Sequence, residues 1–205
     1  MTATAIKRLL ALVLLSSSLT TALTTSGTQS FVGHPVTFTA TVTSTYGPIP
    51  DGELVAFADG TTALASVPLA GGVATYTTSS LNAASHVISA TYAGDATFNI
   101  STKSLTQVVK RNPSSTALSS SLNPSTFGQS VTFTATVTSS YGPIPDGEIV
   151  KFFDGTTTLG SVALSGGIAT YTTSSLGVAS HVIKATYAGD ATFATSTKSL
   201  TQVVN

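Results

Sequence analysis

Val36-Thr-Phe-Thr-Ala-Thr-Val-Thr-Ser44 decides the fold, because apolar and threonine side chains alternate along it without a break. A period of two is typical of a β-strand with one face toward a core and the other toward solvent. It predicts that Phe38, Ala40 and Val42 point inward together with Val36. The same nine residues recur unchanged as Val131–Ser139, an offset of 131 − 36 = 95 residues.

Other segments repeat at the same offset. They are Tyr46–Glu53 with Tyr141–Glu148, Ala74–Leu81 with Ala169–Leu176, and Ala90–Phe98 with Ala185–Phe193. The offset is longer than a solenoid repeat of about 20–50 residues and suits a whole small domain. We therefore expect one domain over residues 19–110 and a second over residues 111–205, each with its own core. Pro113, near the boundary, cannot extend a strand ladder.

Short strands separated by turn residues are expected throughout each copy. In the first copy they are Thr20–Thr25, Val36–Ser44, Glu53–Ala58, Thr62–Leu69, Val73–Thr78, His86–Tyr92 and Lys103–Val109. This number and spacing are typical of an antiparallel sandwich of the immunoglobulin type. The predicted fold class is all-β, with two tandem immunoglobulin-like antiparallel β-sandwiches of about seven strands each.

Differences between the copies indicate which side chains face solvent. Ala56 is replaced by Lys151, and Ser89 is replaced by Lys184. Because an unpaired lysine is rarely buried, both positions should point outward. Their apolar neighbours, such as Val55 and Ile88, should point inward.

Charge and cysteine content exclude several classes of protein. Lys and Arg number 8, Asp and Glu number 8, and no basic run collects phosphate contacts, so nucleic acid is not an expected partner. Cysteine is absent, which excludes a disulfide, a thiolate metal site and a cysteine nucleophile.

Residues 1–18 have the order of a secretory signal. The basic pair Lys7-Arg8 precedes the apolar run Leu9–Leu15, and small polar residues follow over Ser16–Ala22. The run is much shorter than the ~20 residues of a transmembrane anchor, and none is expected. Export to the extracellular space or cell surface is therefore predicted. An N-terminal helix or extra strand is the alternative.

The ordered motifs of the second copy carry a resemblance to a known family. These motifs are Asn123-Pro-Ser-Thr-Phe-Gly-Gln-Ser-Val-Thr-Phe-Thr-Ala-Thr-Val137, Phe153-Asp-Gly155, Gly166-Gly-Ile-Ala-Thr-Tyr-Thr-Thr-Ser-Ser-Leu176 and His181–Asp190. They resemble the bacterial Ig-like domain repeats of exported and surface proteins. The first copy departs at its start, where Thr28-Gln29 replaces Asn123-Pro124 and His34 replaces Gln129. The resemblance implies a spacer or adhesion module and supplies no catalytic residues.

Carboxylates are expected to gather at one end of each sandwich. The candidates are Asp51, Glu53 and Asp95 in the first copy and Asp146, Glu148 and Asp190 in the second. Three carboxylates at one end are candidate ligands for Ca²⁺, the one cofactor considered, which takes six to eight oxygens. Turn formation by Asp-Gly and contact with the basic linker Lys110-Arg111 are the alternatives.

Tyr46 and Tyr141 occupy Gly-Pro-Ile-Pro loops and are the candidate ligand-binding residues. An exposed tyrosine on a stiff loop can stack on a sugar ring, whereas packing over the end of the sandwich is the alternative.

His86 and His181 are in phase with core residues, which favours a structural role. No catalytic arrangement is readable, so an enzyme is not expected.

The sequence thus predicts a non-enzymatic extracellular or cell-surface module that acts as a structural spacer or in adhesion. Its expected partners are other Ig-like repeats or surface proteins. A carbohydrate- or protein-binding accessory module that uses the end loops is the alternative function, with glycans as the candidate ligands.

Overall fold

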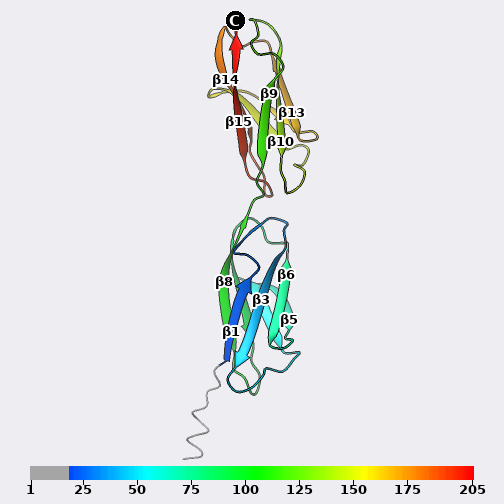
Figure 1. Ribbon diagram of the computed structural model, residues 1–205, viewed down its shortest axis with the longest axis vertical. Helices are drawn as coiled ribbons and strands as arrows, with labels where there is room; N and C mark the ends of the chain where they lie inside the picture. The colour runs from blue at the N-terminus through cyan, green and yellow to red at the C-terminus, as the bar shows by residue number, and fades with distance from the viewer. Residues whose placement is uncertain (1–18) are drawn as a thin grey trace, which may run out of the picture. The chain divides into compact units, whose positions relative to one another are not determined.

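The structure is a computed structural model that describes residues 19–205. Every regular element in this range is a β-strand, and the chain divides into two compact units, of which the first ends at Lys110 and the second spans Arg111–Asn205 (Figure 1). No helix long and apolar enough to cross a membrane occurs within residues 19–205. The predicted signal segment, residues 1–18, lies outside the described residues.

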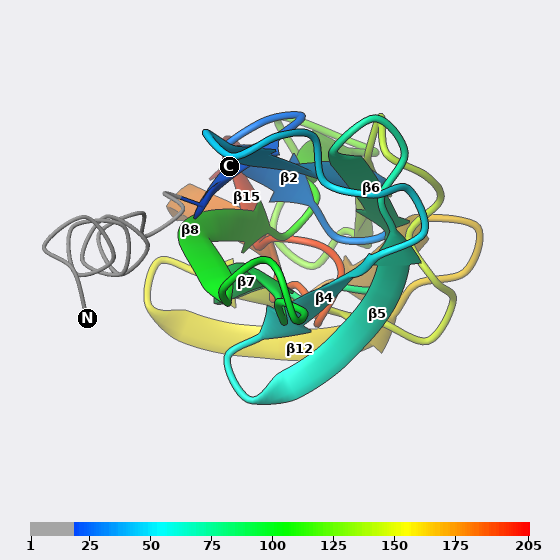
Figure 2. The same cartoon turned by 90° about the horizontal axis from the view of Figure 1, so that it is seen from below.

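The first unit is a sandwich of two sheets. Its strands are β1 (Leu19–Thr25), β2 (Gln29–Phe31), β3 (Val36–Ser44), β4 (Leu54–Asp59), β5 (Thr62–Pro68), β6 (Val73–Thr78), β7 (Ser85–Tyr92) and β8 (Ser101–Lys110). One sheet has the order β1-β3-β6 and the other has the order β2-β8-β7-β4-β5. Figure 2 shows β4 beside β5, the edge strand of the second sheet.

The second unit repeats this arrangement. Its strands are β9 (Ser115–Ser120), β10 (Val131–Thr138), β11 (Ile149–Asp154), β12 (Thr157–Ala163), β13 (Ile168–Thr173), β14 (Ala179–Tyr187) and β15 (Ser196–Val204). The sheets have the orders β13-β10-β9 and β12-β11-β14-β15. The prediction of two tandem immunoglobulin-like sandwiches is confirmed.

The core of each unit is built from the predicted alternation. Phe38, Ala40, Phe133 and Ala135 are fully buried between the sheets, and the intervening threonines face outward. Fully burying a side chain such as phenylalanine contributes roughly 1.5–3 kcal/mol relative to leaving it exposed. The strict alternation therefore fixes the register, because a slip of one residue would expose the whole apolar set.

Lysine positions follow the predicted facing. Lys151 is exposed beside the buried Val150. Lys184 is half-buried, and its Nζ atom lies 4.6 Å from the ring centroid of Phe153, a cation–π contact on the outer face of the sheet. Its neighbour Ile183 is fully buried, as expected.

Two features of the five-stranded sheet of the first unit depart from regular antiparallel pairing. β2 was not expected; it pairs with β8 in parallel, unlike every other strand pair in the unit. The register of β4 against β5 shifts by one residue: Phe57 pairs with Ala65, but the next residue, Ala58, pairs with Ala63. Leu64 is therefore the extra, unpaired residue of a β-bulge.

Candidate functional site

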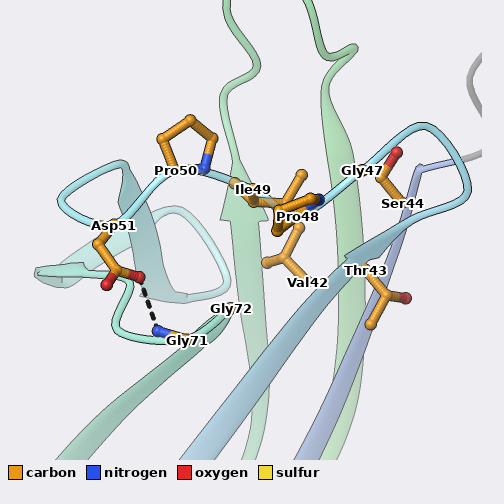
Figure 3. Close-up of a pocket in the computed structure, with 10 residues that line it drawn as sticks. All are labelled: Val42, Thr43, Ser44, Gly47, Pro48, Ile49, Pro50, Asp51, Gly71 and Gly72. Atoms are coloured by element: carbon orange, nitrogen blue, oxygen red, sulfur yellow. Dashed lines mark hydrogen bonds between the residues drawn. The ribbon is translucent and has the colours of Figure 1, made fainter.

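An open hollow lies at the end of each sandwich where the loop from β3 to β4 meets the turn from β5 to β6 (Figure 3). In the first unit its volume is about 750 Å³, and it is lined by Val42, Thr43, Ser44, Gly47, Pro48, Ile49, Pro50, Asp51, Gly71 and Gly72. The matching residues line a hollow of about 620 Å³ in the second unit. The lining is mainly apolar and carries one carboxylate in each copy.

The carboxylate of Asp51 holds this loop in place. Its Oδ1 atom accepts a 2.7 Å hydrogen bond from the backbone N–H of Gly71, and Asp146 accepts the same bond from Gly166 at 2.7 Å. Ile49 is buried against the core beneath the loop. The loop is therefore anchored by two contacts, the burial of Ile49 in the core and the hydrogen bond between Asp51 and Gly71.

The two candidate tyrosines differ in exposure. Tyr46 is 59% exposed, and its backbone N–H donates to Ser44 Oγ at 2.9 Å. Tyr141 is half-buried, and its backbone N–H donates to Ser139 Oγ at 3.1 Å. Both directly precede the Gly-Pro segment in the sequence, but neither tyrosine is among the residues that line the hollow.

Glu53 and Asp95 lie at the same end but on the other side of β4. Oδ1 of Asp95 accepts hydrogen bonds from the backbone N–H groups of Thr97 and Phe98 at 2.6 and 2.7 Å, which is the turn role considered from the sequence. The pKa of the Tyr92 hydroxyl is raised first by burial and then by the negative charges of Asp95 and Glu53. The charges of both carboxylates therefore act on the Tyr92 hydroxyl.

The second unit repeats this cluster. Burial, followed by the charges of Asp190 and Glu148, raises the pKa of Tyr187 to about 12. Asp190 Oδ1 accepts hydrogen bonds from the backbone N–H groups of Thr192 and Phe193. The carboxylates of Asp146 and Asp190 are therefore each used to hold a turn.

The calcium hypothesis remains a prediction. Within residues 19–205 no three His, Cys, Asp or Glu side chains form a group spaced to share one metal ion. In the second unit the linker enters beside Asp190, since Asn112 N–H donates to Thr192 O at 2.7 Å. Arg111, which the structure describes in the same unit, forms no ion pair with Asp146, Glu148 or Asp190.

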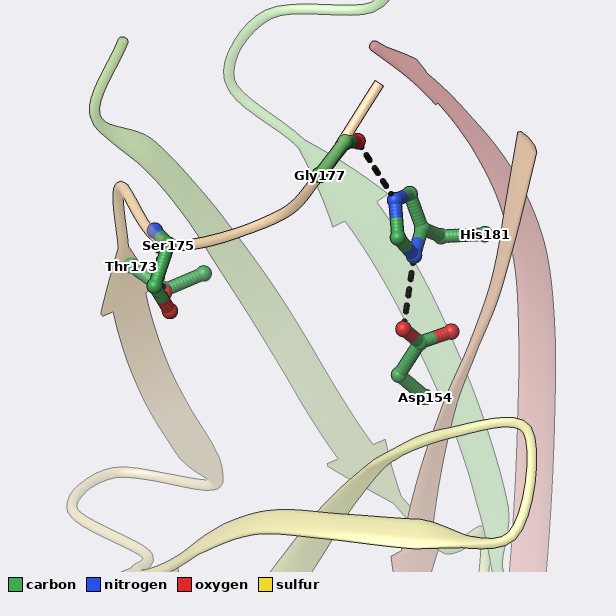
Figure 4. Close-up of polar contacts among 5 residues, drawn as sticks. All are labelled: Asp154, Thr173, Ser175, Gly177 and His181. Atoms are coloured by element: carbon green, nitrogen blue, oxygen red, sulfur yellow. Dashed lines mark hydrogen bonds and ion pairs between the residues drawn. The ribbon is translucent and has the colours of Figure 1, made fainter. Parts of the chain in front are cut away.

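Each unit contains a histidine–aspartate pair that the sequence did not reveal as a pair. In Figure 4, His181 lies between two acceptors: its Nδ1 is 2.6 Å from Asp154 Oδ2 and its Nε2 is 2.9 Å from the carbonyl oxygen of Gly177. Hydrogen bonding to Gly177 raises the pKa of His181, burial lowers it, and Asp154 raises it, with a net increase. His86 pairs with Asp59 in the same way at 2.6 Å. His34 has no histidine counterpart in the second copy, where Gln129 takes its place.

A buried glutamine in the last strand of each unit was also missed. Gln107 and Gln202 are fully buried. The sequence does contain the signal, since Gln107 is in phase with Val109, which points into the core. A buried amide requires hydrogen-bond partners, so its neighbours are constrained.

Several solved structures are similar to this chain at low sequence identity. The Clostridium thermocellum CbhA fibronectin(III)-like modules are 18% identical, with a TM-score of 0.41, covering 90% of this chain and 94% of that chain. The titin domains Z1Z2 in complex with telethonin are 16% identical, with a TM-score of 0.45 and coverages of 90% and 96%. No curated protein sequence matches significantly. The family model described as bacterial Ig-like domain (group 3) matches residues 23–110 and 118–205.

Proposed function

The chain belongs to the bacterial Ig-like domain family, group 3, and on that premise we propose that it is an exported, non-enzymatic spacer and adhesion module of the cell surface. The N-terminal segment with the order of a secretory signal supports export. Two tandem Ig-like units, each with its own hydrophobic core, support a role in holding or extending other parts of a surface structure.

The path of the chain through each unit carries this proposal. In the first unit Leu19 pairs with Ser44 at one end, where Thr21 also reaches Ser101 O at the start of β8. β8 then runs the length of the unit and ends at Lys110. A strand of 10 residues spans about 33 Å, so the chain enters a unit at one end and leaves it at the other. The entry and the exit of the chain are therefore separated by about the length of β8 in the first unit.

Export is tested by following the full chain in a bacterial host. We expect the secreted or surface fraction to contain the protein, shortened at its N-terminus. A variant without residues 1–18 is the matched control and should stay in the cytoplasm. Accumulation of the unshortened full chain in the cytoplasm would contradict the proposal. Intact-cell protease accessibility then separates a surface-bound from a freely secreted product.

Glycan binding at the end hollow is a second candidate function, favoured by one specific observation. Each hollow combines the rings of two prolines with a carboxylate whose position is fixed by a backbone N–H, and a tyrosine precedes the lining Gly-Pro segment in the sequence. The apolar face of a pyranose ring can stack on Tyr46 or on Pro48, while Asp51 accepts hydrogen bonds from sugar hydroxyls. No lysine or arginine lines either hollow, which favours a neutral glycan.

A binding screen of the full chain against neutral and acidic polysaccharides tests this candidate. We expect neutral glycans to bind, and we expect binding to fall at least about 10-fold in Tyr46→Ala/Tyr141→Ala, a loss typical of an aromatic contact. Asp51→Asn/Asp146→Asn should also weaken binding, since the amide oxygen still anchors the loop while the charge is lost. Thr75→Ala/Thr170→Ala, on the outward faces of β6 and β13, is the matched control. Unchanged binding in the tyrosine variants would refute this site.

A further inference from the structure

We infer that each unit binds one Ca²⁺ ion at the end of its sandwich, between two carboxylates and the hydroxyl of a buried tyrosine. The groups are Glu148, Asp190 and Tyr187 in the second unit and Glu53, Asp95 and Tyr92 in the first. Asp51 and Asp146 are not part of the set, because they lie in the end hollows and no three carboxylates of residues 19–205 are spaced to share one ion. The inference goes beyond the proposed spacer function and does not rest on it.

The register of the sheet brings Glu148 and Tyr187 to the same face. Val150 of β11 pairs with Tyr187, and the side chains of paired residues project from one face of a sheet. Both are 0% exposed, so this is the inner face. Leu164 N–H donates to Glu148 O at 2.7 Å, which continues the pairing of β11 to Glu148. Glu148 therefore projects to the inner face as a diagonal neighbour of Tyr187, at a distance of about 7–8 Å that the two long side chains can bridge.

Asp190 is held beside this pair by the turn that follows β14. Its Oδ1 atom accepts hydrogen bonds from the backbone N–H groups of Thr192 and Phe193. These bonds fix the position of the carboxylate while using only one of its two oxygens. The Oδ2 atom therefore remains as a ligand for a cation.

The Tyr187 hydroxyl is the independent observation that points to a bound ligand. The residue is fully buried, and its hydroxyl has no hydrogen-bond partner among residues 19–205. A buried polar group left without a partner is destabilising, so native structures seldom contain one unless a water or an ion completes it. The negative charges of Asp190 and Glu148 both act on this hydroxyl, which therefore points to the space that they share. A cation in that space takes a lone pair of the hydroxyl oxygen, whose proton is then donated to a carboxylate.

No basic side chain of the described residues neutralises these carboxylates. The ion pairs within residues 19–205 are the two histidine–aspartate pairs, so neither Arg111 nor any lysine pairs with Glu148 or Asp190. Two neighbouring carboxylates repel each other, and a divalent cation between them replaces this repulsion by attraction. The donors are oxygens alone, which suits a hard cation, and Ca²⁺ takes six to eight of them with water filling the remaining positions.

The first unit has the equivalent geometry. Val55 pairs with Tyr92, and Asp95 Oδ1 accepts the backbone N–H of Thr97 at 2.6 Å. Tyr92 is 1% exposed, and its hydroxyl also has no partner among the described residues. Because the two sites have the same residues, we expect two ions per chain with similar affinity. With two carboxylates each, the sites should have the Kd of extracellular calcium modules, about 10⁻⁴–10⁻³ M.

Terbium luminescence of the full chain tests the inference. The sequence contains 6 tyrosines and no tryptophan, so Tb³⁺ emission excited through tyrosine reports ions bound beside a tyrosine ring. We expect the emission to saturate at two Tb³⁺ per chain and to be displaced by Ca²⁺. Ca²⁺ at ten times its Kd should also raise the folded-to-unfolded ratio of each unit about 11-fold in urea unfolding. Absence of sensitised emission together with unfolding that is unchanged by Ca²⁺ would overturn the inference and leave water as the partner of the hydroxyl.

Carboxylate variants locate the ions. Glu148→Gln keeps the shape of the side chain and should leave one ion per chain, while Glu53→Gln/Glu148→Gln should leave none. Asp51→Asn/Asp146→Asn is the matched control, because it removes the same charge from the same end of each unit and should keep both ions. Unfolding in the presence of EDTA shows that the glutamine variants are folded. An equal loss of ions in the control would mean that the ions bind diffuse negative charge, which contradicts the site.

Tyrosine variants test the hydroxyl. Tyr92→Phe/Tyr187→Phe keeps every carboxylate, and we expect it to weaken Ca²⁺ binding about 2- to 10-fold, as the loss of one polar contact does. It should also remove most of the Tb³⁺ emission, because the ring nearest to each ion no longer sensitises it. Tyr76→Phe/Tyr171→Phe changes half-buried tyrosines of other strands and should alter neither result. Unchanged Ca²⁺ affinity and emission in the first variant would refute the assignment of the hydroxyl to the site.

Discussion

The Nδ1 atom of His86 lies 2.6 Å from Oδ2 of Asp59, and its Nε2 atom lies 3.0 Å from the backbone carbonyl oxygen of Asn82. Both partners are acceptors, so the geometry is satisfied when both ring nitrogens carry a proton. Burial lowers the pKa of His86, but the bonds to Asn82 and Asp59 raise it by more, and the net pKa is above its ordinary value of 6.5. His181 and Asp154 repeat the pair at 2.6 Å.

The raised histidine pKa values predict that stability falls as pH rises. The folded state binds these protons more tightly than the unfolded state, so their stabilisation is fully present below the unfolded pKa of about 6.5. It is lost as pH rises through the higher folded pKa. Urea unfolding between about pH 6 and pH 9 should show this decline. The double variant His86→Gln/His181→Gln should flatten it, and a decline of equal slope in that variant would contradict the assignment.

Removing the carboxylate of one pair should destabilise one unit. Asp59→Asn replaces a charged acceptor by a neutral amide, and a hydrogen bond to a charged group contributes roughly 1.5–3 kcal/mol. We expect the free energy of unfolding of the first unit to fall by up to about that amount, because solvent screening weakens the interaction at this half-buried site. Thermal unfolding of Asp59→Asn should separate into two transitions, and Asp154→Asn should do the same with the units exchanged. A single unshifted transition in both variants would show that the pair adds nothing to stability.

Local sequence patterns predicted the strands well, because a strand with one buried face alternates apolar and polar residues. Val73–Thr78 has the predicted bounds, and β3 follows the alternation that begins at Val36. β2 was missed because three residues carry no period and its pairing of Gln29 with Val108 joins positions far apart in the sequence. Whether a short segment becomes a strand then depends on the neighbouring strand.

The candidate sites were predictable to a different degree. The phase of His86 indicated its inward position, but its partner Asp59 is set by the register of β4 against β7, where Asp59 pairs with Ile88. The sequence alone does not give that register. The same holds for Gln107, whose phase predicts burial while its side-chain partners come from two other segments, β1 and β2. The inward or outward direction of a side chain can be read from its sequence neighbours, whereas its hydrogen-bond partners come from segments distant in the sequence.

Tyr187→Phe should leave stability unchanged or raise it. The ring is fully buried, and the hydroxyl has no hydrogen-bond partner among the described residues. A buried hydroxyl without a partner costs about 1–3 kcal/mol, so its removal recovers part of that free energy. The free energy of unfolding from urea titration measures the change, with Tyr171→Phe as the control for loss of a half-buried tyrosine hydroxyl. A loss above about 1 kcal/mol would mean that the hydroxyl is bonded in solution, for example through water to Asp190 or Glu148.

Gly94→Ala and Gly33→Ala should differ strongly although their backbones are alike. Gly94 has φ 81° and Gly33 has φ 79°, so both variants carry the strain of an L-residue in the left-handed region, about 1–2 kcal/mol. A Cβ atom on Gly94 would lie 2.6 Å from Phe98 O and 2.8 Å from Ile100 N, whereas one on Gly33 meets nothing within 4 Å. Backbone must therefore move only in Gly94→Ala, and the turn that holds Asp95 must move with it. We expect Gly94→Ala to cost at least about 2 kcal/mol more than Gly33→Ala in urea unfolding of the first unit. Equal losses would mean that the close approach of the chain at Gly94 is not a constraint on this fold.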